Sequence, residues 1–244
     1  MGYPLPAVSH LHRKVWEWSA ISQALLERGC LQAGKRGIGF AVGNEPLVSL
    51  FADAGVRVDA TDLAAGEMAD VWNETAQHAN SKDGLFMDKI VERETFENNV
   101  TFYNADMNNL DGLNKAGYDF AWSSCAMEHL GTLDAGLEFV KNAMDLLKPG
   151  GVACHTTEFN ISSNDATIES GINVLYRKRD LEKLEAEMRM KYCCVEQLDL
   201  FPGTHADDVM FDIAPYGQNQ RPHIKLLMDG YITTSLLLIC RKHG

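Results

Sequence analysis

The sequence predicts an α/β fold: a doubly wound, mainly parallel seven-stranded sheet with helices on both faces and a C-terminal antiparallel hairpin. Between residues 35 and 160, short apolar runs alternate with helical stretches, a pattern that builds a parallel sheet covered by helices. After residue 160, two apolar runs at 192–201 and 230–242 lack an obvious crossover helix between them. Strands joined in this way are expected to pair antiparallel.

The length and composition are sufficient for one domain. The chain has 244 residues, of which 45% are hydrophobic. We expect a single domain over 1–244, with an N-terminal helical segment at 1–34, a ligand-binding core at 35–160 and a C-terminal part at 161–244. The last part contains a Pro/Gly/Asp-rich stretch at 202–222 that we expect to form a substrate-side loop.

The charge and the cysteines exclude several classes of protein. A net charge of −12 argues against a duplex nucleic-acid binder, because that affinity comes mainly from Lys and Arg at phosphates. No signal peptide and no apolar run of about 18 residues is present, so we expect a cytoplasmic protein without a membrane partner. The six cysteines have no C-x-x-C spacing and are expected to be reduced core residues.

The pattern of apolar and turn residues places the elements in order. An amphipathic helix is expected over 9–28, with Leu11, Val15, Trp18, Ile21 and Leu25 on its apolar face. Further helices are expected at 45–55, near 64–79, at 134–147 and at 179–191. Strands are expected at 36–42, 57–63, about 100–106, 118–125 and 152–159, with a turn at 148–151.

The first strand leads into a glycine-rich loop that contains Gly37, Gly39 and Gly43. Glycines at this place let the backbone approach a ligand closely, and a tight structural turn is the alternative interpretation. The loop continues with Asn44, Glu45 and Pro46, so a carboxylate stands where the following helix is expected to begin.

Two acidic residues follow the next strands. Asp62 ends the second strand, where a carboxylate accepts hydrogen bonds from ribose hydroxyls in dinucleotide folds, or caps the next helix. Asp106 follows the third strand with Met107 beside it. This pair is suited to the amine and the face of an adenine ring, and the alternative is an ordinary turn.

The ordered motifs GIGFAVG, VDATDL, YNADMNNL, YDFAWSSCAMEHLG and LLKPGGVACHTTEF resemble the class I S-adenosylmethionine-dependent methyltransferases, from about residue 35 to 160. The resemblance implies that S-adenosylmethionine is the cofactor and that the enzyme transfers its methyl group. It places Gly39 and Gly43 at the amino-acid part of the cofactor and Ser123 and Ser124 near its methyl group. The other cofactor residues that it implies are Asp62 and Leu63 at the ribose, and Asp106 and Met107 at the adenine.

The sequence departs from the family's pattern in its first loop. Gly37 stands where the family usually has an acid, and Ala41 replaces the middle glycine. Glu45 is therefore either a replacement carboxylate for the cofactor's ammonium or a favourable acid in the first turn of the helix, with Pro46 at an early helical position.

A hydroxyl acceptor needs a general base near the methyl group, most often His. His155 with Glu158, His129 and His223 are the candidates, and a cap and a surface position are the alternatives for His129 and His223. A metal site is one interpretation of further Asp, Glu and His residues, ordinary solvated side chains are the other, and we assign no metal. The residues considered for it are His155, Glu158, Asp207, Asp208, Asp212 and His223.

We expect the acceptor to be a small molecule with a hydroxyl group, of the carbohydrate-like or natural-product kind. Trp16, Trp18, Phe211 and Tyr216 would cover its pocket, or serve as ordinary packing. Two alternatives are an NAD(P)-dependent oxidoreductase, because GIGFAV resembles part of a dinucleotide fingerprint, and an inactive binding domain. A homodimer is one alternative for the oligomeric state.

Overall fold

The computed structural model describes residues 12–64, 78–191, 193–217 and 221–244. One nine-stranded sheet runs through these residues in the order β3-β2-β1-β4-β5-β9-β8-β7, with β6 paired to β9. The strands are β1 (Arg36–Phe40), β2 (Arg57–Asp62), β3 (Val100–Asn104), β4 (Tyr118–Ser124), β5 (Leu147–Asn160), β6 (Cys193–Val195), β7 (Asp212–Ile213), β8 (Lys225–Met228) and β9 (Tyr231–Lys242). The pairs from β3 to β5 are parallel, and β9 runs antiparallel to β5.

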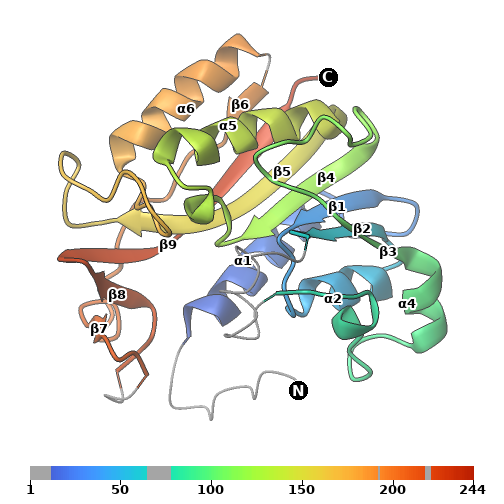
Figure 1. Ribbon diagram of the computed structural model, residues 1–244, viewed down its shortest axis with the longest axis horizontal. Helices are drawn as coiled ribbons and strands as arrows, with labels where there is room; N and C mark the ends of the chain where they lie inside the picture. Colours follow the sequence, from blue (N-terminus) through green and yellow to red (C-terminus); the bar gives the residue numbers. More distant parts are fainter. Residues whose placement is uncertain (1–11, 65–77, 192, 218–220) are drawn as a thin grey trace.

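Helices cover both faces of the sheet, as Figure 1 shows. The helices are α1 (Arg13–Glu27), α2 (Leu47–Asp53), α4 (Arg93–Asn99), α5 (Leu133–Ala143) and α6 (Lys178–Met190). Short 3-10 turns lie at Asp83–Leu85, Met127–His129 and Met144–Leu146. One apolar core joins the sheet to α5 and α6, and a second joins it to α1, α2 and α4. The predicted α/β fold with helices on both faces is confirmed, but the sheet has nine strands among the described residues instead of the expected seven.

The alternating glycines of β1 make room for aromatic side chains of the neighbouring strand. A Cβ added at Gly37 would lie 2.3 Å from Phe120, and one added at Gly39 would lie 2.3 Å from Trp122. Both rings pack edge to face against Phe51 of α2, with centroids 5.8 and 5.0 Å away. Close packing against these two rings therefore explains why glycine occupies positions 37 and 39.

Helix α1 presents a different face to the protein than its apolar pattern predicts. Ile21 and Leu25 are buried as expected, but Val15 is 38% exposed and Glu17 is fully buried. The reason is that the first turns of α1 cover polar strand ends, where Glu17 accepts hydrogen bonds from Ser124 and Ser235. An apolar side chain in that position would leave these hydroxyls without their acceptor.

The C-terminal strands form a more elaborate end than the predicted hairpin. The expected run at 192–201 contributes only β6, which pairs antiparallel with the last residues of β9. The partner at the start of β9 is β8, which joins it through a turn at Asp229 and Gly230, both with positive φ. Strands β7 and β8 were not expected, because the stretch around them is rich in Pro, Gly and Asp.

Other differences are local. The expected turn at 148–151 lies within β5, where the register with β4 shifts between Tyr118 and Phe120. Helix α4 was not expected, and the helix expected near 64–79 lies largely outside the described residues. Within the described part of the chain, no helix is both long and apolar enough to cross a bilayer.

We expect Gly39→Ala to destabilise the protein by about 1–3 kcal/mol, because the new methyl group would overlap Trp122 and Val42 and force the core to shift. Urea unfolding of Gly39→Ala, compared with Gly112→Ala, measures this cost. Gly112 has nothing within 4 Å of an added Cβ, so its variant should stay within about 1 kcal/mol of the wild type. A Gly39→Ala protein of normal stability that loses only ligand affinity would contradict the packing explanation.

Candidate active site

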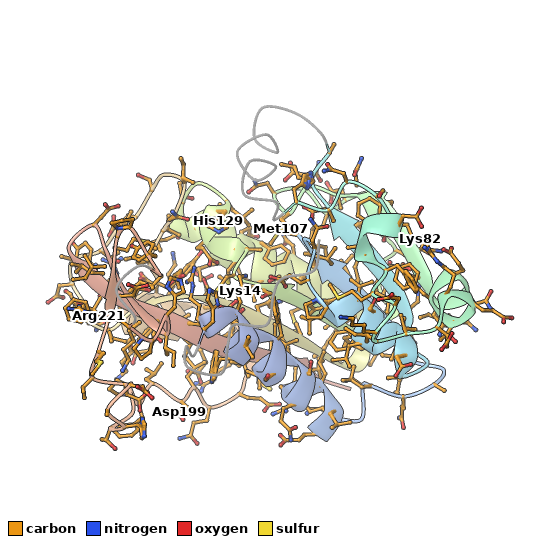
Figure 2. The ribbon with its side chains drawn as sticks, turned by 90° about the horizontal axis from the view of Figure 1, so that it is seen from below. Lys14, Lys82, Met107, His129, Asp199 and Arg221 are labelled. Carbon is orange, nitrogen blue, oxygen red and sulfur yellow. The ribbon has the colours of Figure 1, made fainter. Side chains whose placement is uncertain are left out.

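A cleft with a cavity volume of about 240 Å³ opens at the carboxyl ends of β1 to β4. Ligands of open α/β sheets bind at this edge, because loops from adjacent strands diverge there. Figure 2 shows the cleft residues Lys14, Met107 and His129 close together at the centre of the view, with Lys82, Asp199 and Arg221 towards the periphery. The other residues that line it are Ala41, Gly43, Glu45, Asp62, Leu63, His78, Ala105, Asp106, Asn108, Ser124, Cys125, Ala126 and Leu130.

Asp62 organises the loops at the centre of this cleft. Its Oδ2 accepts hydrogen bonds from the backbone N–H groups of Gly43 (3.0 Å) and Ala79 (3.1 Å), and its Oδ1 accepts one from Leu63 (2.9 Å). His78 Nδ1 lies 3.3 Å from the same Oδ1. The carboxylate therefore joins the end of β2 to the loop after β1 and to the chain that returns at residues 78 and 79. It caps no helix among the described residues.

Asp106 and Met107 form the end of the cleft beyond β3. Asp106 is exposed and its Oδ1 accepts a hydrogen bond from the N–H of Asn108 (2.8 Å), so it makes the expected turn. Met107 is only 7% exposed and packs into the core between the sheet and α5. The cleft thus presents one exposed carboxylate next to a fixed thioether.

Glu45 lies before α2 instead of in its first turn. The helix begins at Leu47 with Pro46 as its N-cap residue, so Glu45 does not act as a first-turn acid. Its side chain lines the cleft and accepts a hydrogen bond from Lys14 Nζ at 3.0 Å. Burial raises the pKa of Glu45, although Lys14 stands beside it and favours the charged form.

Lys14 and Glu17 attach α1 to the strand ends. Lys14 Nζ lies 3.2 Å from Glu17 Oε2 and donates to the carbonyl of Ser124 at 3.1 Å. Burial opposes the charge of Lys14, but Glu45 and Glu17 raise the pKa of its ammonium above the ordinary value. Burial likewise opposes the charge of Glu17, yet Lys14, Arg13 and two hydrogen-bond donors lower its pKa to about 2. These charges stabilise one another within the protein.

The end of β4 divides its side chains between the core and the cleft. Ser124 lines the cleft, whereas Ser123 is fully buried on the opposite face, where its Oγ lies 2.8 Å from His155 Nδ1. Cys125 follows with φ +46 and also lines the cleft. Burial, with Glu128 and Glu17 nearby, raises the pKa of the Cys125 thiol well above its usual range, so the thiol is neutral.

The candidate bases occupy three different environments. His129 lines the cleft, and its Nδ1 lies 2.9 Å from the carbonyl of Ile172. His155 is fully buried against Phe139 outside the cleft, and burial lowers its pKa to about 3. His223 also lies outside the cleft, where Asp212 Oδ2 is 2.8 Å from its Nδ1 and His12 stacks on its ring.

The Asp, Glu and His residues considered as metal ligands do not form a common cluster among the described residues. Glu158 is buried and forms an ion pair with Arg13, and Thr233 donates to it at 2.8 Å. A different group, Cys125, Glu128 and Glu158, has its ligand atoms within 4.8 Å of one another. The Cys125 thiol is neutral, and Glu158 is already paired with the Arg13 guanidinium. We therefore assign no metal to this group.

The predicted residues that line the cleft are Gly43, Glu45, Asp62, Leu63, Asp106, Met107, Ser124 and His129. The predicted residues that lie elsewhere are Gly39, Ser123, His155, His223 and Glu158. Gly39 serves packing, and Ser123 faces the core because neighbouring side chains of a strand alternate between its two faces. Lys14 and His78 were missed, since no local pattern at either residue points to the cleft.

The comparisons with known proteins agree with this architecture. Residues 38–155 match the family model described as a methyltransferase domain. No curated protein matches the sequence significantly.

Several solved structures share the fold. A putative sarcosine dimethylglycine methyltransferase from Galdieria sulphuraria superposes with a TM-score of 0.57 and 15% identity, covering 94% of this chain and 86% of that one. A 1,6-didemethyltoxoflavin-N1-methyltransferase from Burkholderia thailandensis, with its substrate and S-adenosylhomocysteine bound, gives 0.53 and 16%, covering 95% and 82%. The [4+2]-cyclase SpnF gives 0.54 and 15%, covering 92% and 81%.

The family match and the strand order favour a methyltransferase over the oxidoreductase alternative. The matched segment contains the end of β1, all of β2 to β4 and the first part of β5, and the loops after these strands carry most of the cleft. The antiparallel β9 beside β5 agrees with the hairpin expected for the family. Residues 38–155 are therefore similar to a methyltransferase domain, and the chain shares its fold with S-adenosylmethionine-dependent methyltransferases of known structure.

Proposed function

We propose that the protein transfers the methyl group of S-adenosylmethionine to a hydroxyl group of a small carbohydrate-like or natural-product acceptor. The observation that carries the hydroxyl assignment is the position of His129 in the cleft, beside the end of β4. An alcohol must lose its proton as the oxygen attacks the methyl carbon, and a neutral imidazole accepts that proton near pH 7.

The hydrogen bond at Nδ1 supports this role for His129. A carbonyl oxygen only accepts, so the contact with Ile172 O places a proton on Nδ1 of His129. In the neutral ring the lone pair then resides on Nε2. The base is thereby prepared in one tautomer before an acceptor arrives.

The order of strand ends suggests how the cofactor lies in the cleft. Asp106 and Met107 after β3 would hold the adenine, Asp62 and Leu63 after β2 would face the ribose, and Gly43 after β1 would approach the amino-acid part. The methyl group would then lie near Ser124 and Cys125 after β4. Much of the rate enhancement in such a displacement comes from holding donor and acceptor in line.

Lys14 and Glu45 together suit the amino-acid part, which carries one ammonium and one carboxylate. Their side chains are 3.0 Å apart at the edge of the cleft and are complementary to that zwitterion. Glu45 would replace the acid that the family usually has at the position of Gly37. In the complex, Glu45 would form ion pairs with both the cofactor's ammonium and Lys14. Lys14 would in addition form an ion pair with the cofactor's carboxylate.

We expect His129→Gln to lower the rate of methyl transfer to a hydroxyl acceptor by about 10²- to 10⁴-fold, because the base is lost, with little change in cofactor affinity. Release of S-adenosylhomocysteine during incubation with S-adenosylmethionine and a panel of sugars, glycosides, phenols and matched amines measures this rate. His243→Gln, at an exposed residue outside the cleft and outside the 202–222 stretch, is the control and should keep full activity.

Turnover of amines alone, with equal rates in the wild type and in His129→Gln, would contradict the assignment of a hydroxyl acceptor and of the base.

We expect Glu45→Gln to weaken S-adenosylhomocysteine binding by about tenfold or more, because a charged partner of the ammonium is removed. Methylthioadenosine lacks the amino-acid part, so its affinity should be unchanged. Calorimetric titration of both ligands tests this. Glu97→Gln is the control, because Glu97 is an exposed residue of α4 that does not line the cleft. Equal losses for both ligands would show that Glu45 does not act on the ammonium.

A further inference from the structure

The carboxylate of Asp62 is already occupied by the protein itself. A carboxylate offers about four lone-pair sites for donors. Three are taken by the N–H groups of Gly43, Ala79 and Leu63, and His78 Nδ1 lies 3.3 Å from Oδ1. A ribose that enters this cleft therefore meets an acid whose hydrogen-bonding capacity serves the surrounding loops.

His78 offers the acceptor that Asp62 lacks. The residue is 5% exposed and lines the cleft, yet its Nε2 has no hydrogen-bond partner among the residues that the structure describes. A buried ring nitrogen without a partner is unfavourable, and a ligand hydroxyl in the cleft would provide the missing hydrogen bond. The unsatisfied atom thus points to a bound polar group.

The backbone holds His78 in place from both sides. Asn44 Nδ2 donates to the His78 carbonyl at 3.1 Å, and the next N–H, that of Ala79, donates to Asp62. Since Asp62 only accepts, its nearness to Nδ1 favours the tautomer with the proton there and the lone pair on Nε2. Nε2 is then the ring nitrogen that can accept a hydrogen bond from a hydroxyl.

We propose that His78 binds a ribose hydroxyl of the cofactor through Nε2, while Asp62 mainly orders the loops around it. The inference rests on the proposed function, because it concerns the nucleoside part of the same cofactor. Under this proposal His78 provides a contact with the ribose that Asp62, the last residue of β2, would otherwise provide alone.

The test compares two variants that each keep part of the imidazole. His78→Asn retains a polar group near the position of Nδ1 and removes Nε2, whereas His78→Gln extends an amide to the position of Nε2. We expect His78→Asn to weaken both S-adenosylhomocysteine and methylthioadenosine by about 10- to 100-fold, and His78→Gln to retain most of the affinity. His243→Asn, at an exposed residue that does not line the cleft, should bind both ligands as the wild type does.

The 2′-deoxy and 3′-deoxy analogues of methylthioadenosine identify the partner of Nε2. In the wild type, loss of the hydroxyl that His78 holds should weaken binding by about tenfold, and in His78→Asn the same loss should have little effect. Wild-type affinity in a folded His78→Asn, or an undiminished sensitivity of that variant to both deoxy ligands, would overturn the inference.

Two further outcomes are separable. If circular dichroism shows that His78→Asn does not fold, the wild type and His78→Gln decide: indifference of the wild type to both deoxy ligands overturns the inference. A wild type that binds neither S-adenosylhomocysteine nor methylthioadenosine contradicts the proposed function itself, and with it this inference.

Discussion

The cleft depends above all on the hydrogen bonds that converge on the carboxylate of Asp62. Backbone N–H groups from the loop after β1, from the end of β2 and from the chain returning at Ala79 all donate to it. These groups come from separate parts of the sequence, and each would be a buried donor without an acceptor if the carboxylate were absent. One side chain thereby sets the distance between the loops and the width of the cleft. The same constraint removes most of its capacity to bind a ligand.

Helix α1 supplies the second constraint, and it does so with charge as well as with apolar contact. Ile21 and Leu25 anchor the middle of the helix in the core, while Lys14 and Glu17 bind the strand ends. A buried ion pair adds little net stability, but it fixes position, because each charge is costly without its partner. The N-terminal helix therefore contributes to the lining of the candidate site. Its lysine reaches the same cleft as the glycine loop.

The sequence predicted the parallel part of the sheet because strand and helix periods alternate clearly there. It also predicted Gly43, Asp62, Met107 and Ser124 at the cleft, since residues that follow parallel strands meet at one edge of the sheet. It did not separate Ser123 from Ser124, because which face of the sheet a side chain takes depends on the neighbouring layers. The packing of Gly39 was missed for a related reason: its aromatic neighbour, Trp122, comes from another strand.

Lys14 and His78 could not be assigned from local patterns. Each reaches the cleft only through tertiary contacts, Lys14 through the docking of α1 and His78 through Asn44 and Asp62. The short strand β8 was missed because Pro and polar residues precede it, so its pairing with β9 was not evident. Motifs at strand ends therefore do not predict cleft residues that come from a separate helix, such as Lys14, or from a loop, such as His78.

The central claim is that this cleft holds S-adenosylmethionine. The most direct measurement is a calorimetric titration of the purified, cofactor-stripped protein with the product S-adenosylhomocysteine, and in parallel with NADH. The account predicts binding of one S-adenosylhomocysteine per chain with micromolar affinity, and no heat from NADH. No binding of S-adenosylhomocysteine, or binding of NADH in its place, would contradict it.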